Sequence, residues 1–455
     1  MRSRAFMPLV CLFLLAGAGL WAAYPLSISS DGHGFIDKAG NRFLLLGDTG
    51  WLIQRQPLDQ VEWYFEQRRN QGFNTVMVDL VPLYYEVGTG KLDVSRGPRE
   101  DANGNKPLGG DRWREANEAY FNYTLQICQA AEARGMLLIL QVPVVNLVQS
   151  IMQYPTSEQE AAARRLGSIV GARFAAVQNL LWSPSHGDQD LAGNKALVRA
   201  FVIGLRSSGA NQLVTSQGMW RESSREQLQG EDWLDVNGVY TYFPGDRFKA
   251  PQVYAAMTRA VAAKPAMPAF LLESQYEHGP FPLLYPRRQA WWAILSGAAG
   301  MNYGSEKIYF FEKDSWRDSV WSPGAEQMMV IHKFLADNDN QRWLPDLAGE
   351  LLAEGEGMRY LGTLVEDGGS DFATAARRED GRAWAVYFPT TRNVIELRTA
   401  TVAGHSRAWW MDPTTGVKSE CQLRLPSLDR RLHVTPPAES NGGGGGDWVL
   451  VLVKE

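Results

Sequence analysis

Two acidic residues stand where short apolar segments of the chain end. Asp188 follows the apolar segment 180–182 within six residues, and Glu273 follows the segment 269–272 directly. Two carboxyl groups that flank a sugar ring can cleave a glycosidic bond, because one protonates the leaving oxygen while the other attacks carbon or activates water. The chemistry we predict from these residues is glycoside hydrolysis by the pair Asp188 and Glu273.

Alternatives to this pair remain open at the level of the sequence. Asp190 is a second acid in the same loop, but Asp188 is nearer the apolar segment and follows Gly187, which lets the backbone turn sharply. Asp188 can instead cap a loop. Glu273 can instead pair with an arginine, Arg287 or Arg288.

Four further residues are candidates for holding the sugar. Asp48 and Trp51 follow the first apolar segment, Glu277 follows Glu273 by four residues, and Tyr303 ends the last apolar segment. A carboxylate hydrogen-bonds sugar hydroxyls and an indole face stacks on the ring. The alternatives are a turn aspartate, a core tryptophan and a surface acid. A nearby histidine, His186, can tune the pKa of Asp188, although a loop histidine without a role is the simpler interpretation.

Other chemistries leave no pattern in the sequence. The six histidines form no H-E-x-x-H motif and no close pair, and there is no G-x-S-x-G, P-loop or dinucleotide motif. We therefore expect no metal and no cofactor. The formal charge of −5 argues against a nucleic-acid partner. The 16 tryptophans fit either large cores or an oligo- or polysaccharide partner.

The elements that would position these residues alternate between short apolar strands and helix-length amphipathic segments. Eight strands are expected, at 43–46, 75–81, 137–142, 180–182, 213–215, 236–241, 269–272 and 301–303. Helices are expected at 58–70, 115–134, 156–176, 195–206, 251–263, 287–295 and 325–336. Between the fifth and sixth strands no helix is clear. Eight alternating units predict an α/β fold, the (β/α)₈ TIM barrel, in which catalytic residues lie at the C-terminal ends of the strands.

The pattern changes after about residue 339. Short alternating segments follow at 359–365, 382–388, 394–398, 407–411 and 448–453, and turn signals separate them. This is typical of a small all-β sandwich. We therefore expect a barrel over residues 24–345 and a β-sandwich over 346–455.

The N-terminus is typical of a signal peptide over residues 1–23. Arg2 and Arg4 precede an apolar stretch over 6–21, and Ala22-Ala23 follow it. The stretch is short for a membrane span, although a retained anchor is the alternative. We expect cleavage before Tyr24, no membrane span after cleavage, and a secreted or periplasmic protein. No pattern indicates the oligomeric state.

Motifs along nearly the whole chain resemble the apiosidase-like glycoside hydrolases, the group that contains glycoside hydrolase family 140. In the barrel they are LGDTGW at 46–51, RxxxGFN at 68–74, YF at 120–121, AxG at 133–135, NLLW at 179–182, GD at 187–188, Glu273 with Tyr276-Glu277, GAAG at 297–300 and YG at 303–304. WMDPxxG at 410–416 and DWVL at 447–450 are similar to a small β domain often attached, named for collagen binding.

This resemblance implies a retaining mechanism, with Asp188 at the acid/base position and Glu273 at the nucleophile position. The family activity is release of apiose from pectic side chains. One departure is that His186 replaces the first glycine of a Gly-Gly-Asp motif, in a loop that is one residue longer. Two rivals therefore stay open: a catalytically inactive carbohydrate-binding or envelope-adhesion protein on the same barrel, and a lyase or transglycosylase that uses the same carboxylates.

Overall fold

The structure is a computed structural model that describes residues 23–85, 91–187, 189–220, 222–242, 252–279, 282–311, 314–352, 372–390, 395–423 and 431–454. Residue 188, the expected strand at 359–365 and residues 1–22 of the expected signal peptide lie outside these ranges. In the described part of the chain, no helix is both long enough and apolar enough to cross a membrane.

Parallel strands form the barrel wall, in the order β10-β11-β12-β4-β5-β8-β9. They are β4 (Leu45–Thr49), β5 (Thr75–Asp79), β8 (Leu137–Gln141), β9 (Leu180–Ser183), β10 (Asn237–Tyr240), β11 (Ala269–Glu273) and β12 (Gly300–Tyr303). The expected fifth strand is reduced to one parallel bridge between Val214 and Trp182 of β9. The carbonyl of Val214 also accepts a hydrogen bond of 3.1 Å from the backbone of Val236, next to β10, so this residue closes the circle. The predicted barrel is confirmed, with a very short fifth strand.

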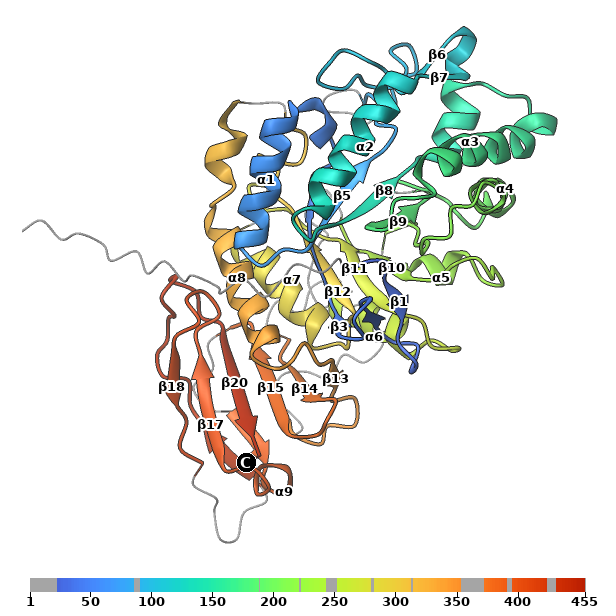
Figure 1. The fold of residues 1–455 in the computed structure, drawn as a ribbon. Coiled ribbons are helices and arrows are strands. Elements are labelled where there is room, and N and C mark those ends of the chain that lie inside the picture. Colours follow the sequence, from blue (N-terminus) through green and yellow to red (C-terminus); the bar gives the residue numbers. More distant parts are fainter. Residues whose placement is uncertain are drawn as a thin grey trace, which may run out of the picture.

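Helices cover the outside of the wall (Figure 1). They are α1 (Leu58–Asn70), α2 (Glu118–Glu132), α3 (Gln159–Phe174), α4 (Lys195–Ser207), α5 (Ser224–Gln227), α6 (Gln252–Ala262), α7 (Leu284–Ile294) and α8 (Pro323–Ala336). Short turns occur at η1 (Ile53–Arg55), η2 (Asp111–Trp113), η3 (Asn146–Ile151), η4 (Thr156–Glu158) and η5 (Asp314–Ser319), and β6 (Leu108–Gly109) pairs with β7 (Glu115–Ala116). The single turn α5, capped by Ser223 and Glu226, fills the unit for which the sequence indicated no helix.

The barrel interior is a separate apolar core. Leu45, Met77, Ile139, Leu181, Phe270 and Leu272 point into it from five strands. Tyr24 and Phe35 complete the same core from the N-terminal segment, where β1 (Ser27–Ile28), β2 (Phe35–Ile36) and β3 (Arg42–Phe43) form a small antiparallel sheet. The hydroxyl of Tyr24 donates to the Gly135 carbonyl, just before β8 begins, so this segment closes the floor of the barrel.

The C-terminal domain is a six-stranded antiparallel sheet in the order β13-β14-β15-β20-β17-β18. Its strands are β13 (Trp343–Pro345), β14 (Thr374–Arg378), β15 (Ala383–Phe388), β17 (Arg407–Met411), β18 (Lys418–Glu420) and β20 (Trp448–Val453). The antiparallel pair of β16 (Ile395–Arg398) and β19 (Arg431–Val434), with the helical turn α9 (Thr399–Val402), packs on one face and forms a second core. The predicted all-β fold is confirmed, and its first strand begins at Trp343, three residues before the expected start at residue 346.

The other face of this sheet packs against α7 and α8 of the barrel (Figure 1). Trp291 of α7 stacks on Tyr387 of β15 at 5.9 Å between ring centroids, and Phe334 of α8 stacks on Trp343 at 5.1 Å. Arg287 adds a buried bidentate ion pair with Asp447, with both N–O distances 2.8 Å. The two domains therefore share one hydrophobic core.

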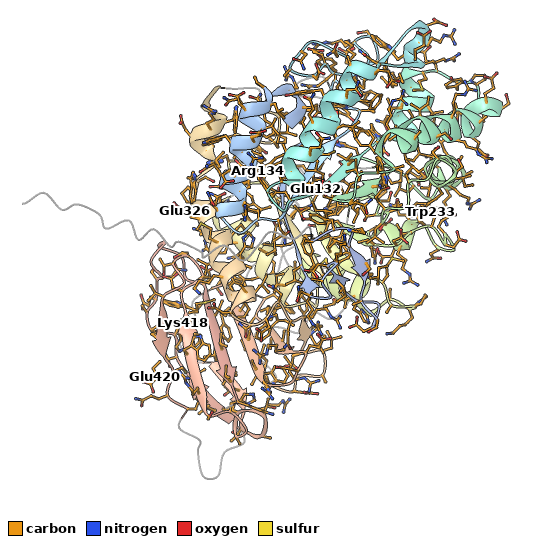
Figure 2. The ribbon with its side chains drawn as sticks, in the orientation of Figure 1. Glu132, Arg134, Trp233, Glu326, Lys418 and Glu420 are labelled. Atoms are coloured by element: carbon orange, nitrogen blue, oxygen red, sulfur yellow. The ribbon has the colours of Figure 1, made fainter. Side chains whose placement is uncertain are left out.

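A groove of about 880 Å³ runs between α8 and the β17–β18 edge. Figure 2 shows Glu326 on α8 and Lys418 on β18, which lie on its two sides. Leu44, Leu46 and Asn74, at the N-terminal ends of barrel strands, also line it. The groove therefore opens at the end of the barrel opposite to that where Glu273 lies.

Candidate active site

Glu273 is the last residue of β11 and lies at the C-terminal end of the barrel. Its side chain is buried, with the residue 8% exposed. The Tyr276 hydroxyl donates to Oε1 at 2.6 Å, and the Gln217 amide donates to Oε2. Burial raises the pKa of Glu273 to about 7, although these two donors and the positive charge of His186 act to lower it. The alternative pairing of Glu273 with Arg287 or Arg288 is not found, because Arg287 binds Asp447 and Arg288 binds the Pro389 carbonyl.

Tyr276, in the loop after β11, and Trp51, which follows β4, hold Glu273 in place. The Trp51 indole N–H donates to the Tyr276 oxygen at 3.0 Å, and that phenol in turn donates to Glu273. A Cβ on Gly304 would lie 2.1 Å from the Tyr276 ring, so a glycine is needed there. Trp51 is buried, with 3% of the residue exposed, and its contact in this structure is the hydrogen bond to Tyr276. Stacking of its indole on a sugar remains a prediction.

Polar side chains from several strands connect His186 to Glu273 in one run of hydrogen bonds. His186 Nδ1 lies 2.6 Å from Asp79 Oδ1 and 3.1 Å from Gln141 Oε1. Both neighbours are acceptors, so Nδ1 carries the proton. The Gln141 amide donates to Gln217 Oε1 at 2.8 Å, and Gln217 donates to Glu273. The N–H groups therefore all point from the imidazole toward the carboxylate.

Sequence reasoning missed most of this network. Asp79 and Gln141 are single polar residues at the ends of apolar strands, and both fall inside segments expected to be strand. Gln217 follows the short fifth strand, and Tyr276 was noticed only as part of a motif. A polar residue closing an apolar strand was the available signal, because strand ends face the mouth of a barrel.

Asp188 lies outside the described residues, and the two residues discussed with it, Gly187 and Asp190, are described. Gly187 has a φ of 66°, a left-handed conformation that favours glycine. Asp190, the alternative acid, is exposed, and its Oδ1 accepts the Gly193 backbone N–H at 2.8 Å. Asp190 therefore stabilises the turn that follows.

Three residues expected to hold the sugar lie in buried contacts on the helix side of the barrel wall. Asp48 is fully buried and binds Arg68 Nε at 2.6 Å together with the Tyr64 hydroxyl, both from α1. Tyr303, the register partner of Asp48 on β12, has its ring 5.7 Å from the Arg68 guanidinium. Residues on a barrel strand alternate between the interior and the helices, and these two face the helices.

Glu277 belongs to the same buried layer. It accepts hydrogen bonds from the Tyr303 hydroxyl, from Ser322 at 2.7 Å and from the Gly324 backbone N–H at 3.0 Å. Ser322 and Gly324 lie at the N-terminus of α8, where unpaired N–H groups and the helix dipole favour a carboxylate. Asp48, Tyr303 and Glu277 therefore connect the wall to α1 and α8 and do not face the mouth.

Aromatic side chains surround the mouth. Tyr242 and Tyr309 each lie 5.2 Å from the Tyr276 ring, and Tyr85 stacks on His186 at 6.3 Å. All three are partly exposed. Among the described residues, no group of His, Cys, Asp and Glu is arranged to hold a metal ion.

The (β/α)₈ barrel and the buried glutamate at the end of its seventh strand fit the active site of a glycoside hydrolase. The chain belongs to the apiosidase-like family, since residues 29–342 match the model described as "Apiosidase-like, catalytic domain". Residues 364–453 match a second model, described as "Putative collagen-binding domain of a collagenase". The class and the family resemblance predicted from the sequence are confirmed.

Solved structures show the same fold along the whole chain. A glycoside hydrolase shares 21% identity, with 96% of this chain and 98% of that chain covered and a TM-score of 0.72. A glycoside hydrolase family 5 protein from Bacteroides vulgatus ATCC 8482 also shares 21% identity, with 94% and 93% covered and a TM-score of 0.72. The curated proteins gave no match.

Proposed function

We propose that this chain is an exported, retaining glycoside hydrolase that acts on a plant or microbial polysaccharide. The observation that carries the proposal is Glu273, a buried carboxylate fixed by two donors, one on each oxygen, at the end of β11. A nucleophile held in this way attacks from a defined direction.

In this mechanism the Glu273 carboxylate attacks the anomeric carbon and forms a C–O bond. The glycosidic C–O bond breaks, and the Asp188 carboxyl gives its proton to the leaving oxygen. Water then attacks the same carbon, the Asp188 carboxylate takes a proton from that water, and the bond to Glu273 breaks. Each step conserves protons, and the anomeric configuration is retained.

The sugar would contact the aromatic rim of Tyr85, Tyr242 and Tyr309. Their partial exposure and their positions around Tyr276 and His186 support this. Aromatic faces contribute binding area with little loss of side-chain freedom. The rim replaces Asp48, Glu277 and Tyr303 as the proposed sugar-binding surface.

The test is a screen of pectic and other cell-wall oligosaccharides, with the released sugar and its first-formed anomer identified by NMR. Glu273→Ala and Asp188→Asn should each lose at least about 10²-fold in rate, while Asp190→Asn stays within about tenfold of wild type. With azide, Glu273→Ala should form a glycosyl azide of inverted configuration. Binding without any released sugar would favour the inactive carbohydrate-binding protein, and an unsaturated product would favour a lyase.

Export has its own measurement. The mature protein should begin near Tyr24 and be recovered outside the cytoplasm. An intact Met1 on protein from the cytoplasmic fraction would contradict this.

A further inference from the structure

A histidine at the barrel mouth, His186, is connected to the proposed nucleophile Glu273 through the side chains of Gln141 and Gln217. His186 takes the place of a glycine expected from the family motif, so its imidazole is an addition to the site. Its side chain is 21% exposed, enough for solvent to reach part of the ring. The proposed mechanism assigns it no role.

The surroundings of His186 favour its charged form. Asp79 accepts its Nδ1 proton at 2.6 Å, and the ring stacks on Tyr85 and meets Trp51 edge-on at 5.0 Å. Carboxylates and aromatic faces both stabilise a cation. Burial lowers the pKa of His186, but the charge and hydrogen bond of Asp79 and the charge of Glu273 outweigh it, so the pKa is raised.

We propose that His186, held by Asp79, is a positioning residue that acts as the counter-charge of Glu273 and keeps this carboxylate ionised for attack. The inference rests on the proposed nucleophilic role of Glu273. The run of N–H groups through Gln141 and Gln217 aligns the amide dipoles with their positive ends toward Glu273. These dipoles add to the effect of the imidazolium on the carboxylate.

The need for such a partner follows from burial. The pKa of Glu273 is about 7 even with the positive charge of His186 acting to lower it, so loss of that charge would raise the pKa further and leave more of the enzyme with an uncharged, non-nucleophilic acid near neutral pH. The titratable groups that face the pair are Asp79 from β5, Tyr85 from the following loop and Tyr276 from the β11 loop. Of these, Asp79 binds the imidazole directly, and its charge acts to raise the pKa of Glu273, against the effect of His186.

The first experiment measures the coupling without any substrate. The chain has six histidines, so ¹³C-histidine labelling allows each to be titrated by NMR, with the His186→Gln variant giving the assignment. The His186 pKa should lie above its ordinary value in wild type, and should fall in both Glu273→Gln and Asp79→Asn. An unchanged His186 pKa in Glu273→Gln would overturn the proposal, even if the enzyme proves to be a hydrolase.

The second experiment uses the substrate found in the screen. His186→Gln keeps an N–H for Asp79 but removes the charge, so the acidic limb of the profile of kcat/KM against pH should move to higher pH. Each pH unit of this movement corresponds to about tenfold lower activity on the acidic side, with activity at high pH little changed. A uniform loss at every pH would show a merely structural role and overturn the proposal. The matched control is His433→Gln on β19, a 53% exposed histidine, which should leave the limb in place.

Discussion

At the scale of single residues, the buried carboxyl group of Glu273 ties activity and stability to pH. Its folded-state pKa of about 7 lies above the ordinary 4.5, so the folded protein holds a proton that the unfolded chain has lost. Stability therefore falls as pH rises between these values.

We predict that Glu273→Gln gains stability relative to wild type as the pH rises from 5 to 8. The neutral amide lacks the burial penalty of the carboxylate, which is roughly 3 kcal/mol above pH 7 for a shift of this size. Thermal melts at both pH values measure the difference in Tm between variant and wild type. A difference that stays constant or shrinks toward pH 8 would contradict the assigned pKa direction.

Asp48 gives the opposite kind of prediction. Asp48→Asn leaves Arg68 buried without its counter-charge, which typically costs about 3–5 kcal/mol. The expected result is a clear loss in the free energy of unfolding, measured by urea titration, with KM of the remaining folded enzyme unchanged. A raised KM with normal stability would restore Asp48 as a sugar ligand.

Only part of the site could be predicted from the sequence. The position of Glu273 at the barrel mouth could be predicted, because this residue directly ends an apolar strand. The direction in which Asp48 and Tyr303 point could not be predicted, because strands buried on both faces show no alternation in the sequence. The partners Gln141 and Gln217 become neighbours only through the barrel register, which spacing along one chain does not contain.

At the scale of elements, the end of β12 fixes the position of Tyr276. The backbone at Gly304 passes so close to the Tyr276 ring that only a glycine leaves room. This contact explains why a glycine follows Tyr303 in the sequence motif.

Gly304→Ala should therefore displace Tyr276 from Glu273 and lower kcat by at least about tenfold, because a small misplacement near reacting groups is costly. The protein should remain folded by circular dichroism. Gly109→Ala is the matched control, because a Cβ at Gly109 meets nothing within 4 Å, and its activity should equal wild type. Equal activity of the two variants would show that Tyr276 does not position the nucleophile.

The elements themselves were largely predictable, since most strands and helices follow apolar periodicity. The fifth strand is the instructive exception: a three-residue apolar segment supplies one bridge through Val214. The length of the fifth strand depends on its pairing with the two neighbouring strands, and the local sequence does not contain this information.

At the scale of the whole molecule, the two domains are held by one core. Deleting residues 343–455 would expose Trp291, Trp292 and Phe334, which are buried against or beside the sheet. We expect the truncated barrel to aggregate or to lose its cooperative melting transition, as shown by light scattering and calorimetry. A soluble, fully active barrel would contradict the shared core.

A milder variant tests the same junction. Asp447→Asn removes the counter-charge of Arg287 and should lower Tm of the full chain while the active site stays intact.

The shared core also bears on how such proteins change over generations. A substitution on the outer face of α7, at Trp291, alters the shape that Tyr387 of β15 must fit. Residues of the barrel domain and of the β domain that meet at this interface should therefore change together. To graft a β domain from one relative onto the barrel of another, the residues of α7 and α8 that face this domain would have to be transferred as well.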